Sequence, residues 1–159
     1  MMELTFREAT EQDCGLILSF IRELAEYEKM LPDVVATEQL LEESLFRQRR
    51  AEVIFAMEDG VEVGFALFFH NFSTFVGRSG LYLEDLFVKP AYRGKGYGKA
   101  LLKRLAKIAL ERGCGRFEWV CLDWNAPSIA FYRSLGAVPQ DEWTIYRVAG
   151  DALQKLATE

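Results

Sequence analysis

The sequence predicts a mixed α/β fold, with one central sheet and helices on both of its faces. Two observations lead to this class. Asp59-Gly60 is a strong hairpin signal between two apolar runs, which predicts antiparallel pairing in the first half. The second half alternates strand-like and helix-like segments, which predicts parallel pairing through helical crossovers. A chain of 159 residues has room for one domain of ordinary size, residues 1–159, and carries no repeats or linkers.

The first half is expected to supply three strands and two helices. Alternation predicts the strands, and apolar residues at helical spacing predict the helices. Thr37 is a candidate N-cap for the second helix, and Pro32 ends the region of the first. In chain order the segments are the strand Leu4–Arg7, the helices Asp13–Glu28 and Glu38–Arg49, the strands Val53–Met57 and Val61–His70, and a loop over 71–80.

The second half is expected to alternate strands and helices up to the end of the chain. Its longest helix has leucines and an isoleucine on one side, and Gly113 follows it as a fitting C′ residue. Gly136 closes the next helix in the same way. The segments are the strand Leu81–Val88, the helix Lys99–Glu111, the strand Arg116–Leu122, the helix Asn125–Leu135, the strand Glu142–Val148 and a short final helix.

Composition excludes several classes of function. The net charge of −5 argues against broad, charge-driven nucleic-acid binding. His70 is the single histidine, so a His-His metal site is impossible, and no zinc-type spacing is present. We therefore expect no metal. His70 lies in a Phe-rich stretch, and we interpret it as a strand residue rather than a base.

Cysteine usage and hydropathy indicate the compartment. Cys14, Cys114 and Cys121 are odd in number and scattered, which favours a reducing compartment without a disulfide framework. The chain starts directly into predicted structure without an apolar leader, and no apolar run approaches the ~20 residues that a membrane helix needs. We expect a soluble, cytoplasmic protein with no membrane partner.

The most informative stretch joins a predicted strand to a predicted helix. Glycines at alternate positions let successive backbone N–H groups point into one concavity, and the helix adds the positive end of its dipole. Arg93 and Lys99 add flanking positive charge. A glycine-rich turn without a ligand is the alternative, but strand, turn, charges and helix together favour an anion site suited to a diphosphate. The stretch reads Val88-Lys89-Pro90-Ala91-Tyr92-Arg93-Gly94-Lys95-Gly96-Tyr97-Gly98-Lys99.

Two common phosphate motifs do not match this turn. A Walker A loop requires Ser or Thr after Gly-Lys, but Ala100 follows Gly98-Lys99. The dinucleotide fingerprint requires Gly-x-Gly-x-x-Gly near a first strand, whereas this turn lies two-thirds along the chain. The pattern Arg-x-x-Gly-x-Gly fits Arg93, Gly96 and Gly98.

Arg93-Gly94-Lys95-Gly96-Tyr97-Gly98 after a Leu-Phe-Val strand resembles the acetyl-CoA pyrophosphate loop of GNAT superfamily N-acetyltransferases, and the order of elements resembles that fold along the whole chain. Four further stretches resemble the diamine acetyltransferase branch, which includes spermidine/spermine acetyltransferase and a thialysine-acetylating type. They are Arg7-Glu8-Ala9-Thr10, Ile21-Arg22-Glu23-Leu24-Ala25-Glu26-Tyr27-Glu28, Tyr82-Leu83-Glu84-Asp85-Leu86-Phe87-Val88 and Asp123-Trp124-Asn125-Ala126-Pro127-Ser128.

The resemblance implies an acetyl-CoA-dependent N-acetyltransferase that transfers acetyl directly to the primary amine of a small cationic acceptor. It also implies a homodimer. The backbone of Leu86, Phe87 and Val88 would hold the pantetheine arm, and the Val88 N–H would face the developing oxyanion. The cofactor-binding residues implied are Leu86, Phe87, Val88, Arg93, Gly94, Lys95, Gly96, Tyr97, Gly98, Lys99, Asn125, Pro127 and Ser128.

Tyr132 is implied as the general acid toward the CoA sulfur. A phenol with a pKa of about 10 stays protonated at neutral pH and can protonate a thiolate. By sequence alone, Tyr132 equally fits an aromatic packed on the buried face of its helix beside Phe131. Asn125 at the start of this helix fits an N-cap as well as a cofactor contact.

Glu84 and Asp85 are adjacent on a predicted strand, so regular alternation would place them on opposite sides of the sheet. The resemblance places Glu84 near the amine, where it would relay a proton through water. The alternative is a pair of carboxylates satisfied by Arg or backbone partners. We favour function for Glu84 and leave the role of Asp85 open.

The acceptor would be a cation in water, so we expect remote carboxylates to bind its far ammonium and a drier spot to let the reacting amine lose its proton. Tyr27 and Glu28 resemble the amine-binding pair, although Glu28 also fits a solvated helix end. Asp141 or Glu142 would add a carboxylate, and the sequence does not choose between them. The remaining acceptor-lining positions implied are Glu84, Glu118, Trp119 and Val120.

The segment 72–77, Phe-Ser-Thr-Phe-Val-Gly, lacks the Asp and Trp of the polyamine enzyme and is more similar to the thialysine type. One carboxylate fewer favours a shorter amine, such as a diamine or a lysine-like amino acid. Two alternatives remain: the same fold acting on a protein lysine or N-terminus, and a non-catalytic CoA-binding module.

Overall fold

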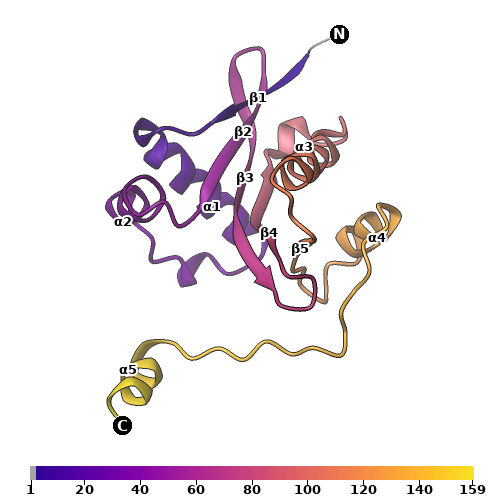
Figure 1. The fold of residues 1–159 in the computed structure, drawn as a ribbon. Helices are drawn as coiled ribbons and strands as arrows, with labels where there is room; N and C mark the ends of the chain where they lie inside the picture. Colours follow the sequence, from indigo (N-terminus) through magenta and orange to yellow (C-terminus); the bar gives the residue numbers. More distant parts are fainter. Residues whose placement is uncertain (1–2) are drawn as a thin grey trace. The chain divides into compact units, whose positions relative to one another are not determined.

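The computed structural model describes residues 3–159, which fall into two compact units, residues 3–120 and Cys121–Glu159. The first unit holds all the strands of the sheet (Figure 1). Its elements are β1 (Leu4–Glu8), α1 (Cys14–Tyr27), α2 (Glu38–Leu41), a π-helical stretch (Glu42–Arg47), β2 (Glu52–Glu58), β3 (Val61–Ser73), β4 (Arg78–Val88), α3 (Tyr97–Glu111) and β5 (Phe117–Trp119). The second unit holds α4 (Ala126–Ser134) and α5 (Gly150–Thr158). One domain over residues 1–159 stays a prediction.

The sheet order is β1-β2-β3-β4-β5, with antiparallel pairing up to β4 and a parallel β4–β5 pair. The predicted mixed sheet is therefore confirmed. The hairpin turn between β2 and β3 has positive φ at both Asp59 (50°) and Gly60 (75°), as two-residue hairpin turns require.

Helices lie on both faces of this sheet, as the sequence predicts (Figure 1). Gly64 and Phe65 are neighbours on β3 and therefore face opposite sides. Phe65 belongs to the core cluster that includes α1, whereas the Cβ position of Gly64 lies 3.3 Å from Leu101 of α3. The absent side chain at Gly64 lets α3 approach the strand closely.

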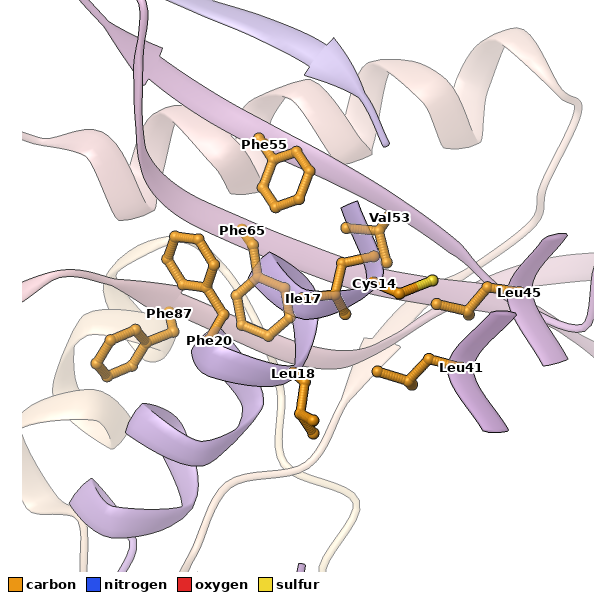
Figure 2. Close-up of a cluster of buried hydrophobic side chains, with 10 residues drawn as sticks. All are labelled: Cys14, Ile17, Leu18, Phe20, Leu41, Leu45, Val53, Phe55, Phe65 and Phe87. Atoms are coloured by element: carbon orange, nitrogen blue, oxygen red, sulfur yellow. The ribbon is translucent and has the colours of Figure 1, made fainter. Parts of the chain in front are cut away.

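The core between α1 and the sheet is built around phenylalanine rings (Figure 2). Phe20 of α1 stacks on Phe65 at 5.0 Å between centroids and tilts against Phe55 at 5.9 Å. All three rings are fully buried, and each contributes roughly 1.5–3 kcal/mol of hydrophobic stabilisation. Leu41 and Leu45 extend the cluster from the second helical region.

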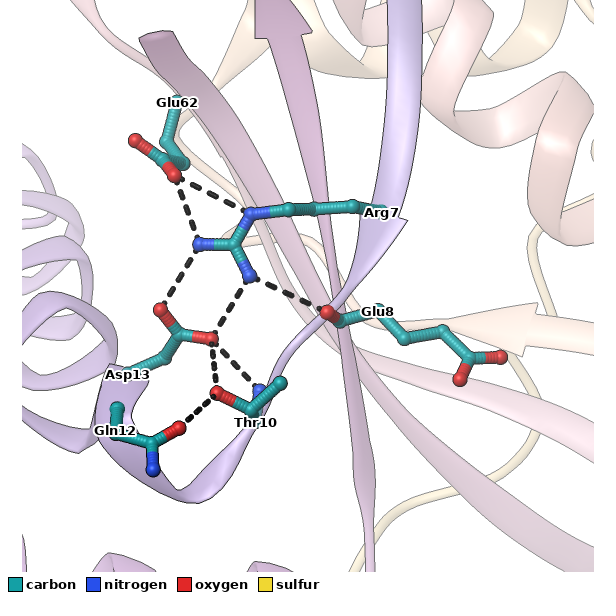
Figure 3. Close-up of polar contacts among 6 residues, drawn as sticks. All are labelled: Arg7, Glu8, Thr10, Gln12, Asp13 and Glu62. Carbon is teal, nitrogen blue, oxygen red and sulfur yellow. Dashed lines mark hydrogen bonds and ion pairs between the residues drawn. The ribbon is translucent and has the colours of Figure 1, made fainter. Parts of the chain in front are cut away.

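A network of partly buried ion pairs links β1 to the start of α1 and to β3 (Figure 3). Arg7 Nη1 lies 2.9 Å from Asp13 Oδ2, and Arg7 Nη2 lies 2.8 Å from Glu62 Oε1. Asp13 also accepts a hydrogen bond from the Thr10 backbone N–H at 2.7 Å, which caps the first turn. The hydrogen bonds from Arg7 lower the pKa of Asp13 to about 2.

Several predicted elements differ from the structure. The region 71–80 is mostly strand, because β3 runs on to Ser73 and β4 starts at Arg78, so the turn is confined to 74–77. The helix predicted over Glu38–Arg49 is α-helical only to Leu41 and then widens into the π-helical stretch. The strand predicted over Arg116–Leu122 shrinks to Phe117–Trp119.

The predicted last strand, Glu142–Val148, is wrong for the described structure, where these residues form no strand. Their alternation is a sheet-compatible pattern, but a strand also requires a neighbouring strand to complete its hydrogen-bond ladder. The side chains of this segment are instead exposed, with Trp143 73% and Tyr146 91% accessible.

Candidate active site

Strands β4 and β5 pair over a short distance and then part. Their parallel ladder runs from Leu81↔Phe117 to Leu83↔Trp119, whereas β4 continues to Val88. On its other edge, β4 remains paired with β3 up to Gly64↔Val88. The stretch Glu84–Val88 thus follows the β5 ladder with a free edge next to the glycine turn, which is where the pantetheine arm is predicted to bind.

A β-bulge interrupts β4 at this point. The register steps from Leu83 to Asp85 while β3 moves from Phe68 to Leu67, so Glu84 is the extra residue. The expectation that Glu84 and Asp85 lie on opposite sides assumed that side chains alternate regularly between the two faces of the sheet. The bulge interrupts this alternation. Asp85, paired with Leu67, shares the face of Phe87 and α1, whereas Leu83, paired with Phe68, shares the opposite face.

The two adjacent carboxylates have unequal environments. Glu84 is exposed and Asp85 is partly buried. Burial raises the pKa of Asp85 to about 6, and the charges of Glu84 and Glu28 add to the rise. Burial also raises the pKa of Glu28, which caps the end of α1. Asp85, whose role the sequence left open, is therefore a candidate for proton exchange near neutral pH.

Arg93 joins the glycine turn to the end of α1. Its Nε donates to the Val88 carbonyl at 2.9 Å. Its guanidinium carbon lies 5.0 Å from the ring centroid of Phe87 and 5.3 Å from that of Tyr27. Four predicted site residues are thus brought together, with a fixed positive charge between the strand end and the predicted acceptor residue Tyr27.

The glycine turn has the geometry of an anion cradle. Gly94 and Gly96 both have a φ of +80°, and a Cβ at either position would meet open space. Gly96 is the N-cap of α3, which begins at Tyr97, so Gly98 and Lys99 lie in its first turn. Alternating left-handed backbone at a helix N-terminus suits a phosphate group, because N–H groups and the helix dipole act together. The residues present fit a diphosphate.

Lys95 and Tyr97 have a partner that the sequence did not reveal. The Lys95 ammonium lies 3.1 Å from a carboxylate oxygen of Glu58, and the buried Tyr97 hydroxyl donates to the same oxygen. Glu58 ends β2, immediately before the hairpin turn. Nothing local in the sequence marks it, because its neighbours in the fold lie 37 and 39 residues further along the chain.

The predicted acceptor residues on β5 lie within the parallel ladder and directly after it. Glu118 pairs with Tyr82 in register, and its carboxylate accepts a hydrogen bond from the Asn71 side chain at 3.2 Å. The Trp119 ring contacts Phe117 at 4.9 Å between centroids. Val120 follows the last strand residue and is exposed.

The second unit contains the remaining predicted site residues. Asn125 is buried and caps α4, with its Oδ1 accepting from the Ser128 N–H at 3.4 Å, so the predicted N-cap is confirmed. Pro127 lies in the first turn of this helix. The Tyr132 ring lies 5.7 Å from that of Phe131. Asp141 and Glu142 are both exposed.

Within residues 3–159, no cluster of His, Cys, Asp and Glu has the size and geometry to hold a metal ion. Over the same residues, no helix combines the length and apolar character that crossing a membrane demands.

Comparison with known proteins gives consistent matches. Residues 18–137 match the model of the Acetyltransferase (GNAT) family. Thialysine N-epsilon-acetyltransferase of Sus scrofa is 40% identical over 169 aligned residues, covering 99% of both chains. L-ornithine N5-acetyltransferase of Arabidopsis thaliana is 33% identical, covering 94% of this chain and 86% of the relative.

Solved structures agree. An integron cassette protein from the mobile metagenome of V. cholerae superimposes with a TM-score of 0.82 and 32% identity over the full length of both chains. A ribosomal-protein-alanine N-acetyltransferase from Brucella melitensis shares the fold, with a TM-score of 0.72 at 22% identity over 93% of this chain and 100% of that one. The five-stranded mixed sheet, the glycine cradle and these full-length similarities converge on one conclusion: the chain belongs to the GNAT family of acetyltransferases.

Proposed function

We propose that this enzyme transfers the acetyl group of acetyl-CoA to the primary amine of a small cationic acceptor, such as a diamine, a lysine- or ornithine-like amino acid, or a polyamine. The observation that carries the proposal is a group of three carboxylates: Glu84 and Asp85 on β4, the strand that leads into the glycine cradle, and Glu28 at the end of α1. Acidic residues beside an anion cradle suit a cationic acceptor and an anionic donor. The names of the thialysine and ornithine acetyltransferases support the same acceptor class.

The donor side of the proposal uses the end of β4 and the turn after it. Leu86, Phe87 and Val88 would hold the pantetheine arm through their backbone, and the Val88 N–H would face the carbonyl oxygen as charge develops on it. The backbone N–H groups of the turn Arg93–Lys99 would hold the diphosphate. Asn125, Pro127 and Ser128 complete the proposed cofactor contacts.

Proton transfer in this proposal involves three side chains. A protonated amine is not a nucleophile, so it must first lose a proton. Asp85, with a pKa of about 6, is ionised at neutral pH and can accept that proton directly or through water, with Glu84 at the more exposed position. Tyr132 would donate a proton to the departing thiolate. Acetyl-CoA supplies an acyl group already activated as a thioester.

The acceptor side rests on residues around the end of α1 and on β5. Tyr27 and Glu28 would bind the far end of the acceptor, and Glu118, Trp119 and Val120 would line its path. Glu118 already accepts a hydrogen bond from Asn71, which reduces its capacity to bind a second ammonium. A short amine with one remote charge therefore fits this set better than a long polyamine.

We also propose that the enzyme is a cytoplasmic homodimer. The extended segment Glu142–Val148 exposes Trp143, Ile145 and Tyr146, which are side chains typical of protein interfaces. The free cysteines at 14, 114 and 121 fit a reducing compartment. Sedimentation at several concentrations tests the dimer, and a monomer throughout the micromolar range would contradict it.

The decisive experiment measures CoA release with a panel of acceptors: thialysine, ornithine, short diamines, spermidine and basic peptides. We expect turnover with the short amines and the weakest turnover with peptides. Asp85→Asn serves as the matched variant, with turnover strongly reduced and acetyl-CoA affinity retained. Activity on peptides alone would contradict the small-amine proposal, and acetyl-CoA binding without turnover on any acceptor would contradict the enzymatic one.

A further inference from the structure

Glu58 is a buried carboxylate in an unexpected place. It is only 6% exposed, and it lies against the residues of the glycine turn, where a negative charge opposes the binding of a diphosphate. The hydrogen bond from Tyr97 and that from Lys95 lower its pKa, so it is ionised at neutral pH. Because this negative charge weakens the attraction of the turn for an anion, we expect Glu58 to have a structural role that offsets the loss.

The contacts of Glu58 reach both sides of Gly96. Lys95 precedes this glycine and Tyr97 follows it, and both bind the same carboxylate oxygen. Lys95 in turn lies between Gly94 and Gly96, which both have a φ of +80°. Glycine allows the positive φ angles of this turn, but it also lets the backbone adopt other conformations. A single anchor on both neighbours of Gly96 restricts that freedom.

The Lys95 side chain is also held from other directions. Its ammonium lies 5.4 Å from the ring centroid of Tyr92 and 5.9 Å from that of Tyr97, which places it against two aromatic rings as well as the carboxylate. Its charge is therefore already paired within the protein. Arg93 and Lys99 differ in this respect, since neither has an ion pair with a carboxylate among those found in residues 3–159.

We propose that Glu58 is a positioning residue for the diphosphate turn: by holding Lys95 and Tyr97, it fixes the backbone around Gly96 in its anion-binding shape before the ligand arrives. In this arrangement Lys95 supports the shape of the turn instead of binding the diphosphate directly. The identity of the ligand as CoA rests on the proposed function, whereas the anchoring itself does not.

The test compares the affinity of CoA for the wild type, Glu58→Gln, Lys95→Met and the double variant by calorimetry. We expect either single change to weaken binding about tenfold, the scale of one lost charge-assisted hydrogen bond, and the double variant to lose little more. In Glu58→Gln the KM for acetyl-CoA should rise, while kcat at saturation and the KM for the amine stay within about twofold. If Lys95 binds the diphosphate directly, Glu58→Gln frees its charge and tightens binding, which would overturn the proposal.

Glu52→Gln is the matched control. Glu52 lies at the other end of β2 and is likewise paired with a basic side chain, Arg112 Nη1 at 2.6 Å, but it is exposed and does not contact the turn. Its removal should leave CoA affinity unchanged. An equal loss of affinity in Glu52→Gln would assign the effect to the strand in general and would overturn the specific role of Glu58.

Hydrogen exchange of the ligand-free protein separates this inference from the proposed function. The amide of Ala100, which donates to the Gly96 carbonyl at 3.0 Å, should exchange about tenfold faster in Glu58→Gln than in the wild type, with the C-terminal half of α3 unchanged. Tyr97→Phe, which removes only a hydroxyl, should show a smaller change of the same sign and covers the case in which Glu58→Gln fails to fold. A wild type without CoA affinity contradicts the proposed function. Wild-type affinity with unchanged exchange and unchanged affinity in both variants contradicts only the role of Glu58.

Discussion

Asp85→Asn should make the protein more stable and less active. Burial raises the pKa of Asp85 from its usual 3.8 to about 6, so the folded state binds this proton more tightly than the unfolded chain does. At ~1.36 kcal/mol per pH unit, a difference of about two pH units costs folding roughly 3 kcal/mol once both states are ionised. Asparagine has nearly the same shape and no charge, so the substitution should recover up to this amount.

The direction of the pKa shift decides at which pH the effect is seen. The stabilising contribution of the protonated Asp85 is fully present below pH 3.8 and is lost as the pH rises through about 6. Urea unfolding should therefore show Asp85→Asn and wild type alike near about pH 4 and separated by roughly 3 kcal/mol near about pH 8. Asp33→Asn is the same chemical change at an exposed site and should stay within about 0.5 kcal/mol. Equal stabilities at the higher pH, or a gain that does not depend on pH, would refute the environment assigned to Asp85.

Other consequences follow from the same structure. Tyr132→Phe should lower kcat by about 10²-fold or more while CoA affinity stays intact; full activity would assign the acid to another group. Gly96→Asp should weaken CoA binding, because the φ of +80° disfavours a side chain and the carboxylate repels a diphosphate; Gly113→Asp, with a φ of +72° after α3, should leave affinity unchanged in the same titration. Asp13→Asn should cost roughly 1–2 kcal/mol at neutral pH, because it breaks the pair with Arg7. This loss of stability should disappear as the pH falls from 3.8 through about 2, where Asp13 becomes protonated in the wild type as well. If urea unfolding still shows the variant to be less stable at that acidic pH, the ion pair is not the cause.

Local patterns predicted what depends on local structure. The helical spacing of Asp13–Glu28, the Asp59-Gly60 turn and the glycine turn before α3 all report on neighbours in the chain, and each was found close to its predicted place. Spacing alone does not assign roles to the candidate site residues, and these roles came from the resemblance to the family.

Features that depend on distant partners were not predictable in this way. The alternation of Glu142–Val148 gives no information about whether another strand lies beside it. The bulge at Glu84 depends on the register between β3 and β4, and the environment of Asp85 depends on the approach of α1. Glu58 acquires its partners only when the end of β2 is brought to the start of α3. In each case the missing information is a long-range pairing that composition and spacing do not encode.

The bulge in β4 has a consequence for how this enzyme could change during evolution. Glu84 and Asp85 are chemically near-equivalent, and the extra residue in the strand decides which of them is placed against α1. If the bulge moved by one position, so that Asp85 became the extra residue, Glu84 would pair with Leu67 and take the place on the face of α1. A shift of the bulge can therefore exchange the environments of the two carboxylates without altering either residue, and relatives with the same Glu-Asp pair can differ in which of the two lies against α1.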